Sequence, residues 1–534
     1  MKFKEFLKDF FVGIKSGISR FLTAFICTIL FYLTSAYTIL FESDNDKIII
    51  PLCMSFALTA VLSVLLKTVQ EYLTDKLKNG IQYAVCAISA VATFILTKVY
   101  YESLYMIMSY TGIMIALVCF IFFVLMRGDN RDLVFPRLVS SSVFASAICG
   151  VLSGGLSTCL AAFQSLIFSF DDFYKVYEIV LLFIWIVCYI NVFLSFIPKK
   201  DVPVPQSKIF RIFALFAGLP IYILLIAILL VYLAKIVITW NMPVGEINWF
   251  ASFASLFFIF FLLSVRQYSE KIAKLFSKYG GYFLLPVLVM QAIAVFERIN
   301  AYGLTTPRTV SLVLIVISVL FIIGSIIAPK HLNKIALVSG IIVLLVTITP
   351  LNVIDMPVKS QTKILENVLV KNDMIKNGKV VPNENVSEED TKIISSAYYY
   401  LKNNADKVPD FIEDPDKTFK EIFGVEGYNR YTNSNITYAN YETKDTVDIS
   451  GYKTMIDTSY YYEDVFEVEH DGKKYNIDLK QISKQLYDQY GEGNKELDLY
   501  IVDENISLYF SNLQITVDNG EITYIYFDGY ALLK

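Results

Sequence analysis

The charge pair Glu297 and Arg298 is the first place in this sequence where chemistry is conceivable, because it ends a long apolar run. Tyr302, Gly303 and Arg308 follow in the same stretch, FERINAYGLTTPR. An ionisable group at membrane depth costs about 2.5–3.5 kcal/mol, so it usually faces a partner or a wet cavity. We therefore expect either a structural or interfacial role or a site for a ligand or ion, with the two arginines flanking an anion.

The backbone of this stretch predicts where two helices meet. Gly303 can adopt a positive φ angle, Thr305 and Thr306 carry hydroxyls that cap helices, and Pro307 fits a helix's first turn. Glu297 and Arg298 are neighbours in sequence, so they point about 100° apart on a helix and cannot share one partner direction. We expect Arg298 to pair with a buried carboxylate or with carbonyl oxygens.

A second candidate is the acidic group Glu42, Asp44 and Asp46, which lies between the first two apolar segments. Membrane glycosyltransferases that use lipid-linked sugars often place a catalytic acid in the first external loop. Here the loop is only about six residues long, which leaves little room for a substrate cleft. The alternative is an ordinary solvated acidic loop.

Metal and cofactor chemistry find no support in the sequence. Its two histidines, His331 and His470, each lack a second histidine or a cysteine nearby, and all seven cysteines lie within apolar segments. There is no Walker sequence, no glycine-rich dinucleotide loop and no HExxH helix. We therefore expect no metal site and no cofactor.

Composition predicts an integral membrane protein. Of 534 residues 55% are hydrophobic, and the mean hydropathy is +0.53. Residues 1–20 form a basic amphipathic segment, which we expect to be retained and cytoplasmic. The eleven apolar segments that follow cover roughly residues 21–41, 48–66, 80–97, 104–126, 138–168, 176–198, 209–234, 247–265, 281–298, 309–328 and 335–353. Pro220 and Pro286 should bend the seventh and ninth spans.

The distribution of positive charge predicts the orientation. The N-terminus and the loops on its side hold 21 Lys and Arg, whereas the loops on the other side hold 6. Because positive loops stay in the cytoplasm, we expect the N-terminus inside and the chain after the eleventh span outside. From residue 354 onward the net charge is −14, which argues against nucleic-acid binding by this part.

The residues after the last span predict an α+β domain. We expect a linker over 354–386 and a domain over 387–534, following the transmembrane domain over 21–353. Its predicted helices cover 387–401, 416–423 and 481–490, and its predicted strands cover 464–469, 474–479, 497–502, 506–517 and 522–527. The fold class is thus an all-α polytopic bundle of about eleven transmembrane helices with a C-terminal extracytoplasmic α+β domain.

The stretch FERINAYGLTTPR resembles the RI-x-x-YGLT-x-x-R signature of the bacterial membrane family called domain of unknown function 4153. A second similarity runs from Gly218 through Tyr222 and Lys235 to Pro243. Thr309 stands where the family usually has an aromatic residue, and the resemblance covers roughly residues 20–350. It implies a bacterial inner-membrane protein and no catalytic residue, since the family has no established reaction.

The function that fits these observations is non-enzymatic. We expect a multi-pass protein of the bacterial cytoplasmic membrane that binds, senses or transports a small molecule, a lipid or an envelope component. Its partners would be the lipid bilayer and an envelope protein or small-molecule ligand, and its oligomeric state stays open. The alternative is a membrane-embedded, glycosyltransferase-like enzyme that acts on a lipid-linked substrate.

Overall fold

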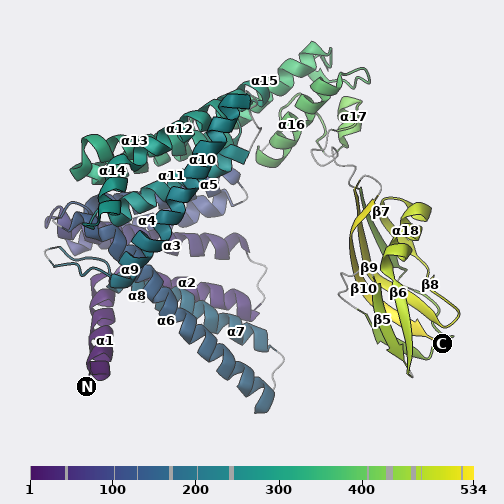
Figure 1. The fold of residues 1–534 in the computed structure, drawn as a ribbon, viewed down its shortest axis with the longest axis horizontal. Coiled ribbons are helices and arrows are strands. Elements are labelled where there is room, and N and C mark those ends of the chain that lie inside the picture. Colours follow the sequence, from purple (N-terminus) through teal and green to yellow (C-terminus); the bar gives the residue numbers. More distant parts are fainter. Residues whose placement is uncertain are drawn as a thin grey trace. The chain divides into compact units, whose positions relative to one another are not determined.

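The structure is a computed structural model in which the chain forms two units (Figure 1). It describes residues 2–41, 46–101, 103–128, 130–167, 172–200, 202–239, 246–405, 408–415, 417–427, 437–444, 446–458, 465–470, 472–518 and 521–534. One unit comprises Met1–Val381 with Ser396–Lys417, and the other comprises Pro382–Ser395 with Thr418–Lys534. The domain bounds expected from the sequence, at residues 353/354 and 386/387, stay predictions.

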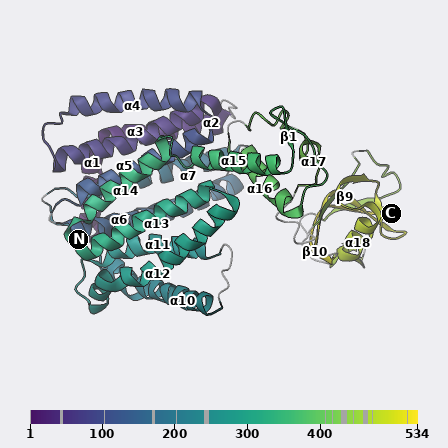
Figure 2. The same ribbon diagram turned by 90° about the horizontal axis from the view of Figure 1, so that it is seen from above.

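Eleven helical segments of the described chain are long and apolar enough to cross a membrane, as predicted. Figure 2 shows successive segments lying side by side and running back and forth. They follow the helix α1 (Lys2–Arg20) and are α2 (Leu22–Phe41), α3 (Asp46–Tyr72), α4 (Asn79–Val99), α5 (Leu104–Leu125), α6 (Arg131–Leu166), α7 to α8 (Phe173–Ser195), α9 to α10 (Lys208–Thr239), α11 (Glu246–Val265), α12 (Lys271–Tyr302), α13 (Thr306–Ile327) and η3 to α14 (Pro329–Ile348).

Two spans contain a π-helical turn that the sequence pattern does not reveal. In the sixth span η1 (Phe183–Cys188) separates α7 (Phe173–Leu182) from α8 (Tyr189–Ser195). In the seventh span η2 (Phe213–Gly218) separates α9 (Lys208–Ile212) from α10 (Leu219–Thr239) and ends just before Pro220. Proline has no backbone N–H to donate, and a π turn is one way in which a helix accommodates such an irregularity.

Small residues let some spans approach closely. On α5, a Cβ atom added at Gly112 would lie 2.2 Å from Thr347 Oγ1 of α14. Ser109 donates a hydrogen bond of 3.0 Å to the Thr347 carbonyl at the same crossing. On α14, a Cβ atom at Gly340 would lie 2.7 Å from the Phe120 ring. Such close contacts are a main source of helix association in a bilayer, where lipid tails compete equally for apolar side chains.

Beyond the last span the chain forms α15 (Asp355–Lys371), a two-stranded ribbon of β1 (Ile375–Lys376) and β2 (Lys379–Val380), α16 (Glu388–Asn404) and α17 (Phe419–Phe423). The expected linker over 354–386 therefore contains a helix of 17 residues. The predicted short helix ends at Phe423 as expected, and Gly424 follows it with a φ angle of +82°. Its N-terminus is a capping box, because Thr418 and Glu421 each bond the other's backbone N–H.

The remaining chain forms a mixed sheet with the strand order β4-β10-β9-β3-β7, and β8 also pairs with β9. Its elements are β3 (Thr437–Thr443), β4 (Thr454–Asp457), the hairpin of β5 (Val465–His470) and β6 (Lys473–Asp478), α18 (Leu479–Tyr490), β7 (Gly493–Leu497), β8 (Tyr500–Ile501), β9 (Ile506–Asp518) and β10 (Glu521–Leu533). The predicted α+β class is confirmed. The single strand predicted over 497–502 is wrong, because β7 pairs with β3 and β8 pairs with β9.

The close approach of α5 and α14 gives a testable prediction. Replacing Gly112 with Leu should force the two helices apart and lower the melting temperature of the detergent-solubilised protein, because overpacking costs about 1–3 kcal/mol. Gly150→Leu is the matched control, since a Cβ atom at Gly150 meets nothing within 4 Å. Equal melting temperatures for the two variants would contradict this packing.

Candidate functional site

The stretch FERINAYGLTTPR forms the predicted junction between two helices. α12 ends at Tyr302, Gly303 has a φ angle of +73°, and α13 starts at Thr306 with Pro307 in its first turn. The Gly303 N–H donates a hydrogen bond of 2.8 Å to the Ile299 carbonyl. A side chain at position 303 would be strained by this φ angle, and a Cβ atom there would lie 2.2 Å from Ile364 Cδ1. Both the backbone conformation and the lack of space next to Ile364 therefore require glycine at position 303.

Helix α15 binds this turn through two polar side chains. Gln361 is 2% exposed, and its Nε2 donates to the carbonyls of Tyr302 at 2.8 Å and Leu304 at 2.9 Å. Ser360 Oγ accepts the Leu304 N–H at 3.0 Å. These bonds pair backbone groups that a helix end otherwise leaves unsatisfied. The turn at Tyr302, Gly303 and Leu304 is therefore a docking site for α15, which we call the socket.

A second set of bonds ties the start of α13 to two other segments. Thr306 Oγ1 donates to the Val353 carbonyl at 2.7 Å, and the Thr306 N–H donates to Tyr400 Oη at 3.1 Å. Tyr400 Oη lies 2.8 Å from Thr306 Oγ1. Since the threonine proton is directed to Val353, the tyrosine hydroxyl donates in this contact. The Thr306 hydroxyl thus contacts both Tyr400 of α16 and Val353, which follows the last span.

The predicted charged residues lie on both helices that flank the turn, Glu297 and Arg298 on α12 and Arg308 on α13. Arg308 is half-buried and donates through Nη1 to the carbonyls of Gly303 and Tyr302, so it caps the end of α12. Glu297 is exposed and Arg298 is half-buried on the last turns of α12. The geometry assigns Arg308 a structural contact. A ligand site formed by Glu297, Arg298, Tyr302, Gly303 and Arg308 stays a prediction.

Of the acidic group near the first span, Glu42 and Asp44 lie outside the described residues. Asp46 is exposed and begins α3. An acidic residue in a helix's first turn interacts favourably with the partial positive charge of that end. This position accounts for Asp46 without a catalytic role, and the catalytic hypothesis for the group stays a prediction.

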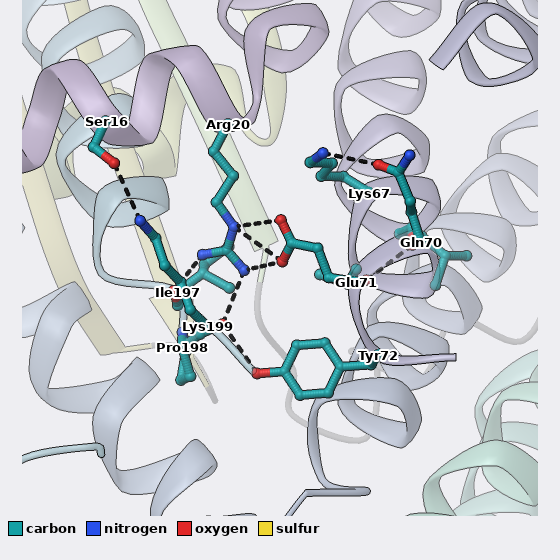
Figure 3. A network of polar contacts seen from close by, with 11 residues as sticks. Ser16, Arg20, Lys67, Gln70, Glu71, Tyr72, Ile197, Pro198 and Lys199 are labelled. Carbon is teal, nitrogen blue, oxygen red and sulfur yellow. Dashed lines mark hydrogen bonds and ion pairs between the residues drawn. The ribbon is translucent and has the colours of Figure 1, made fainter. Parts of the chain in front are cut away.

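A network at the opposite ends of the spans was not predicted (Figure 3). Arg20, at the end of α1, donates through Nη2 to Glu71 Oε2 at 2.6 Å and through Nε to Oε1 at 3.0 Å. The same guanidinium donates to the carbonyls of Ile197 at 2.6 Å and Pro198 at 2.9 Å. Tyr72 also donates to Pro198 at 3.1 Å. Only 7% of the Arg20 side chain is exposed, so one paired charge joins α1, α3 and the segment after α8.

Other charged residues at this end also have acidic partners. Arg266 Nε lies 3.7 Å from Asp132 Oδ1, and Arg211 donates to Glu270 Oε1. The bond from Arg211 lowers the pKa of the Glu270 carboxyl. The sequence suggests only that these residues orient the protein, because the partners are separated by 51 to 134 positions.

The second unit has a sheet face that carries tyrosines. Alternation along β9 and β10 points Leu513, Ile515, Ile525 and Phe527 into the core, so their neighbours point outward. The outward side chains are Tyr438 and Asn440 of β3, Tyr509, Asn512, Gln514 and Thr516 of β9, and Tyr524, Tyr526, Asp528 and Tyr530 of β10. We call these residues the tyrosine face. The sequence showed the tyrosines but not their common side, because β3 was not predicted.

Comparison with known proteins gives one match. The family model described as domain of unknown function (DUF4153) matches residues 22–374. The match includes the eleven spans, the turn at Gly303 and all of α15. No curated protein and no solved structure matches the chain. The matched region extends past the residue 350 expected from the signature, so α15 belongs with the spans that it contacts.

The hydrogen bonds between Gln361 and the turn give a prediction about how firmly α15 is held. Gln361→Leu leaves the carbonyls of Tyr302 and Leu304 without their donor, which costs about 1–3 kcal/mol. We expect α15 to separate from the turn more often, so trypsin should cleave at Lys359 and Lys363 faster than in the parent protein. Asn367→Leu, an exposed position on the same helix, is the control. Unchanged cleavage in Gln361→Leu would show that the bonds do not hold α15.

Proposed function

We propose that this chain, which belongs to the DUF4153 family as its sequence resemblance predicted, binds a glycan of the bacterial cell envelope through the tyrosine face. The membrane unit anchors the binding domain in the cytoplasmic membrane. The observation that carries the proposal is the combination of tyrosine rings with amide and carboxylate side chains on one outward sheet face. Ligand sites typically combine aromatic surface with a few polar groups in this way.

The aromatic part of the face is accessible. Tyr438 is 62% exposed and Tyr524 is 47% exposed. The rings of Tyr509 and Tyr530 lie 6.1 Å apart with an interplanar angle of 55°. Tyrosine offers a large apolar ring and a hydroxyl, and it loses little conformational entropy on binding. The C–H face of a sugar ring can pack on such a ring while its hydroxyls reach the neighbouring polar groups.

The polar part of the face offers hydrogen-bond acceptors for sugar hydroxyls. Gln514 is exposed and Asp528 is half-buried on adjacent strands of this face, and both side chains carry acceptor oxygens. Asn440 Nδ2 donates to Glu442 Oε1 at 3.0 Å. The carbonyl oxygens of Asn440 and Asn512 are buried, so Gln514 and Asp528 supply the acceptors that a ligand can reach.

Charge and orientation narrow the class of glycan. Residues 354–534 carry a net charge of −14, which opposes binding of a polyanion and favours an uncharged or amino-sugar chain. The distribution of Lys and Arg among the loops predicts that this domain lies outside the cytoplasmic membrane, on the side where envelope glycans lie. The chain passes between the two units at three places, one of which lies within α16.

The proposal is tested with the full-length protein in nanodiscs and purified, teichoic-acid-free peptidoglycan as the probe. Tyr526→Ala with Tyr530→Ala should lower the bound fraction at least about tenfold, since each aromatic contact contributes on the order of 1 kcal/mol. Tyr490→Ala, which removes an exposed tyrosine of α18, is the control. Labelling of Ser450→Cys by an impermeant maleimide on intact cells fixes the side of the domain. Equal binding by all three proteins, or labelling only after permeabilisation, contradicts the proposal.

A further inference from the structure

A cavity of about 420 Å³ lies where α1, α6 and the segment from α8 to α9 meet. Its lining includes Phe10 and Gly13 of α1, Arg137 and Ser141 of α6, and Phe196 and Ser207 from the following segments. This volume lies within the range of small-ligand sites. The cavity is separate from both the turn at Gly303 and the tyrosine face.

Arg137 is the unusual residue of this cavity. Its guanidinium is half-buried and lies 4.9 Å from the centre of the Phe196 ring, and it forms no ion pair or hydrogen bond with any described residue. Three other arginines at this end of the spans, Arg20, Arg211 and Arg266, each have an acidic partner. A charge withdrawn from water without a counter-ion is costly, so an anion in the cavity would stabilise it.

The cavity also contains an unused hydroxyl. Ser141 is 3% exposed, and its Oγ has no hydrogen-bond partner among the described residues. Ser140, one residue earlier, differs because its Oγ donates to the Pro136 carbonyl at 2.6 Å. None of the described residues that line the cavity is acidic. A guanidinium and a free hydroxyl together match the charge and the acceptor oxygens of a phosphate group.

The position of α1 indicates where such a ligand would come from. Phe11 and Val12 are 64% and 59% exposed on the same helix that carries the exposed residues Lys8 and Lys15. Figure 1 shows α1 running at a steep angle to α2 and α3. A helix with exposed apolar and basic residues that lies across the spans is typical of the membrane–water interface. Lipid phosphate groups lie at this depth.

Contacts hold α1 against the wall of the cavity. A Cβ atom at Gly17 would lie 2.7 Å from Ser195 Cα, so α1 and α8 touch at the backbone. Lys199 Nζ donates to Ser16 Oγ at 3.1 Å. The rings of Phe10 and Phe144 lie 6.4 Å apart, edge to face. The cavity is thus bounded by packed elements on both sides.

We propose that this cavity binds the phosphate group of a phosphate ester through Arg137 and Ser141, with an anionic phospholipid headgroup as its source in the membrane. A soluble phosphate ester has the same chemistry and is the other source. The guanidinium supplies charge and paired donors, and the serine supplies one further donor. The rings of Phe10, Phe144 and Phe196 cover the apolar part next to the phosphate.

Two variants test the site in different ways. Arg137→Gln removes the charge, whereas Gly13→Leu keeps the charge and fills the cavity. A Cβ atom at Gly13 meets nothing within 4 Å, so the leucine can be accommodated without displacing the helix. Lys330→Gln removes an exposed positive charge at the same end of the bundle, outside the cavity, and serves as the control. Gly13→Leu decides the outcome if Arg137→Gln does not fold.

The full-length protein is placed in nanodiscs of phosphatidylcholine with a minor fraction of phosphatidylglycerol, and native mass spectrometry measures the phosphatidylglycerol retained. We expect at least about tenfold lower affinity in Arg137→Gln and Gly13→Leu and no change in Lys330→Gln. Calorimetry with glycerol 3-phosphate is the second arm. Dependence of that binding alone on Arg137 and Gly13 would support the phosphate site with a soluble source. Variant-independent results in both arms would overturn the proposal.

Discussion

The hydrogen bonds around the turn between α12 and α13 determine how the chain continues after its last span. Gln361 and Ser360 bind the carbonyls and the N–H of this turn, and Thr306 binds both Val353 and Tyr400. Gly303 is buried at this helix end, so protein groups pair the free backbone atoms in place of water. The contacts with α15 and with Tyr400 therefore explain the polar residues of the stretch FERINAYGLTTPR. Any effect of this stretch on function would pass through the segment that contacts it.

At the opposite end of the spans, charged side chains pair groups from different segments. Arg20 pairs with Glu71 and two carbonyls, and Arg211 pairs with Glu270. Each pair joins segments that are distant in sequence. Arg137 differs from these two arginines because its positive charge faces a cavity and has no acidic partner among the described residues. A ligand that completes this pattern has to be an anion.

The sequence predicted those features that depend on local pattern. Hydropathy located the eleven spans, and Gly303 and Pro307 located the turn because their backbone preferences act within a few residues. The partners of the turn could not be predicted, since Gln361 and Tyr400 lie 57 to 94 positions away in segments without a distinguishing pattern. Arg20 likewise contributed only to the orientation. The strand expected over 497–502 failed because its two halves pair with different strands.

The central claim is that the signature turn is a structural socket for the chain that follows the spans. A double-mutant cycle of Thr306→Val and Tyr400→Phe, measured by equilibrium unfolding in mixed detergent micelles, tests it most directly. Residues that share a hydrogen bond typically show a coupling free energy of about 0.5–3 kcal/mol, and we predict a value in this range. The cycle corrects for the separate bond from Thr306 to Val353, which only the threonine substitution removes. Additive effects, with a coupling of zero, would contradict the account.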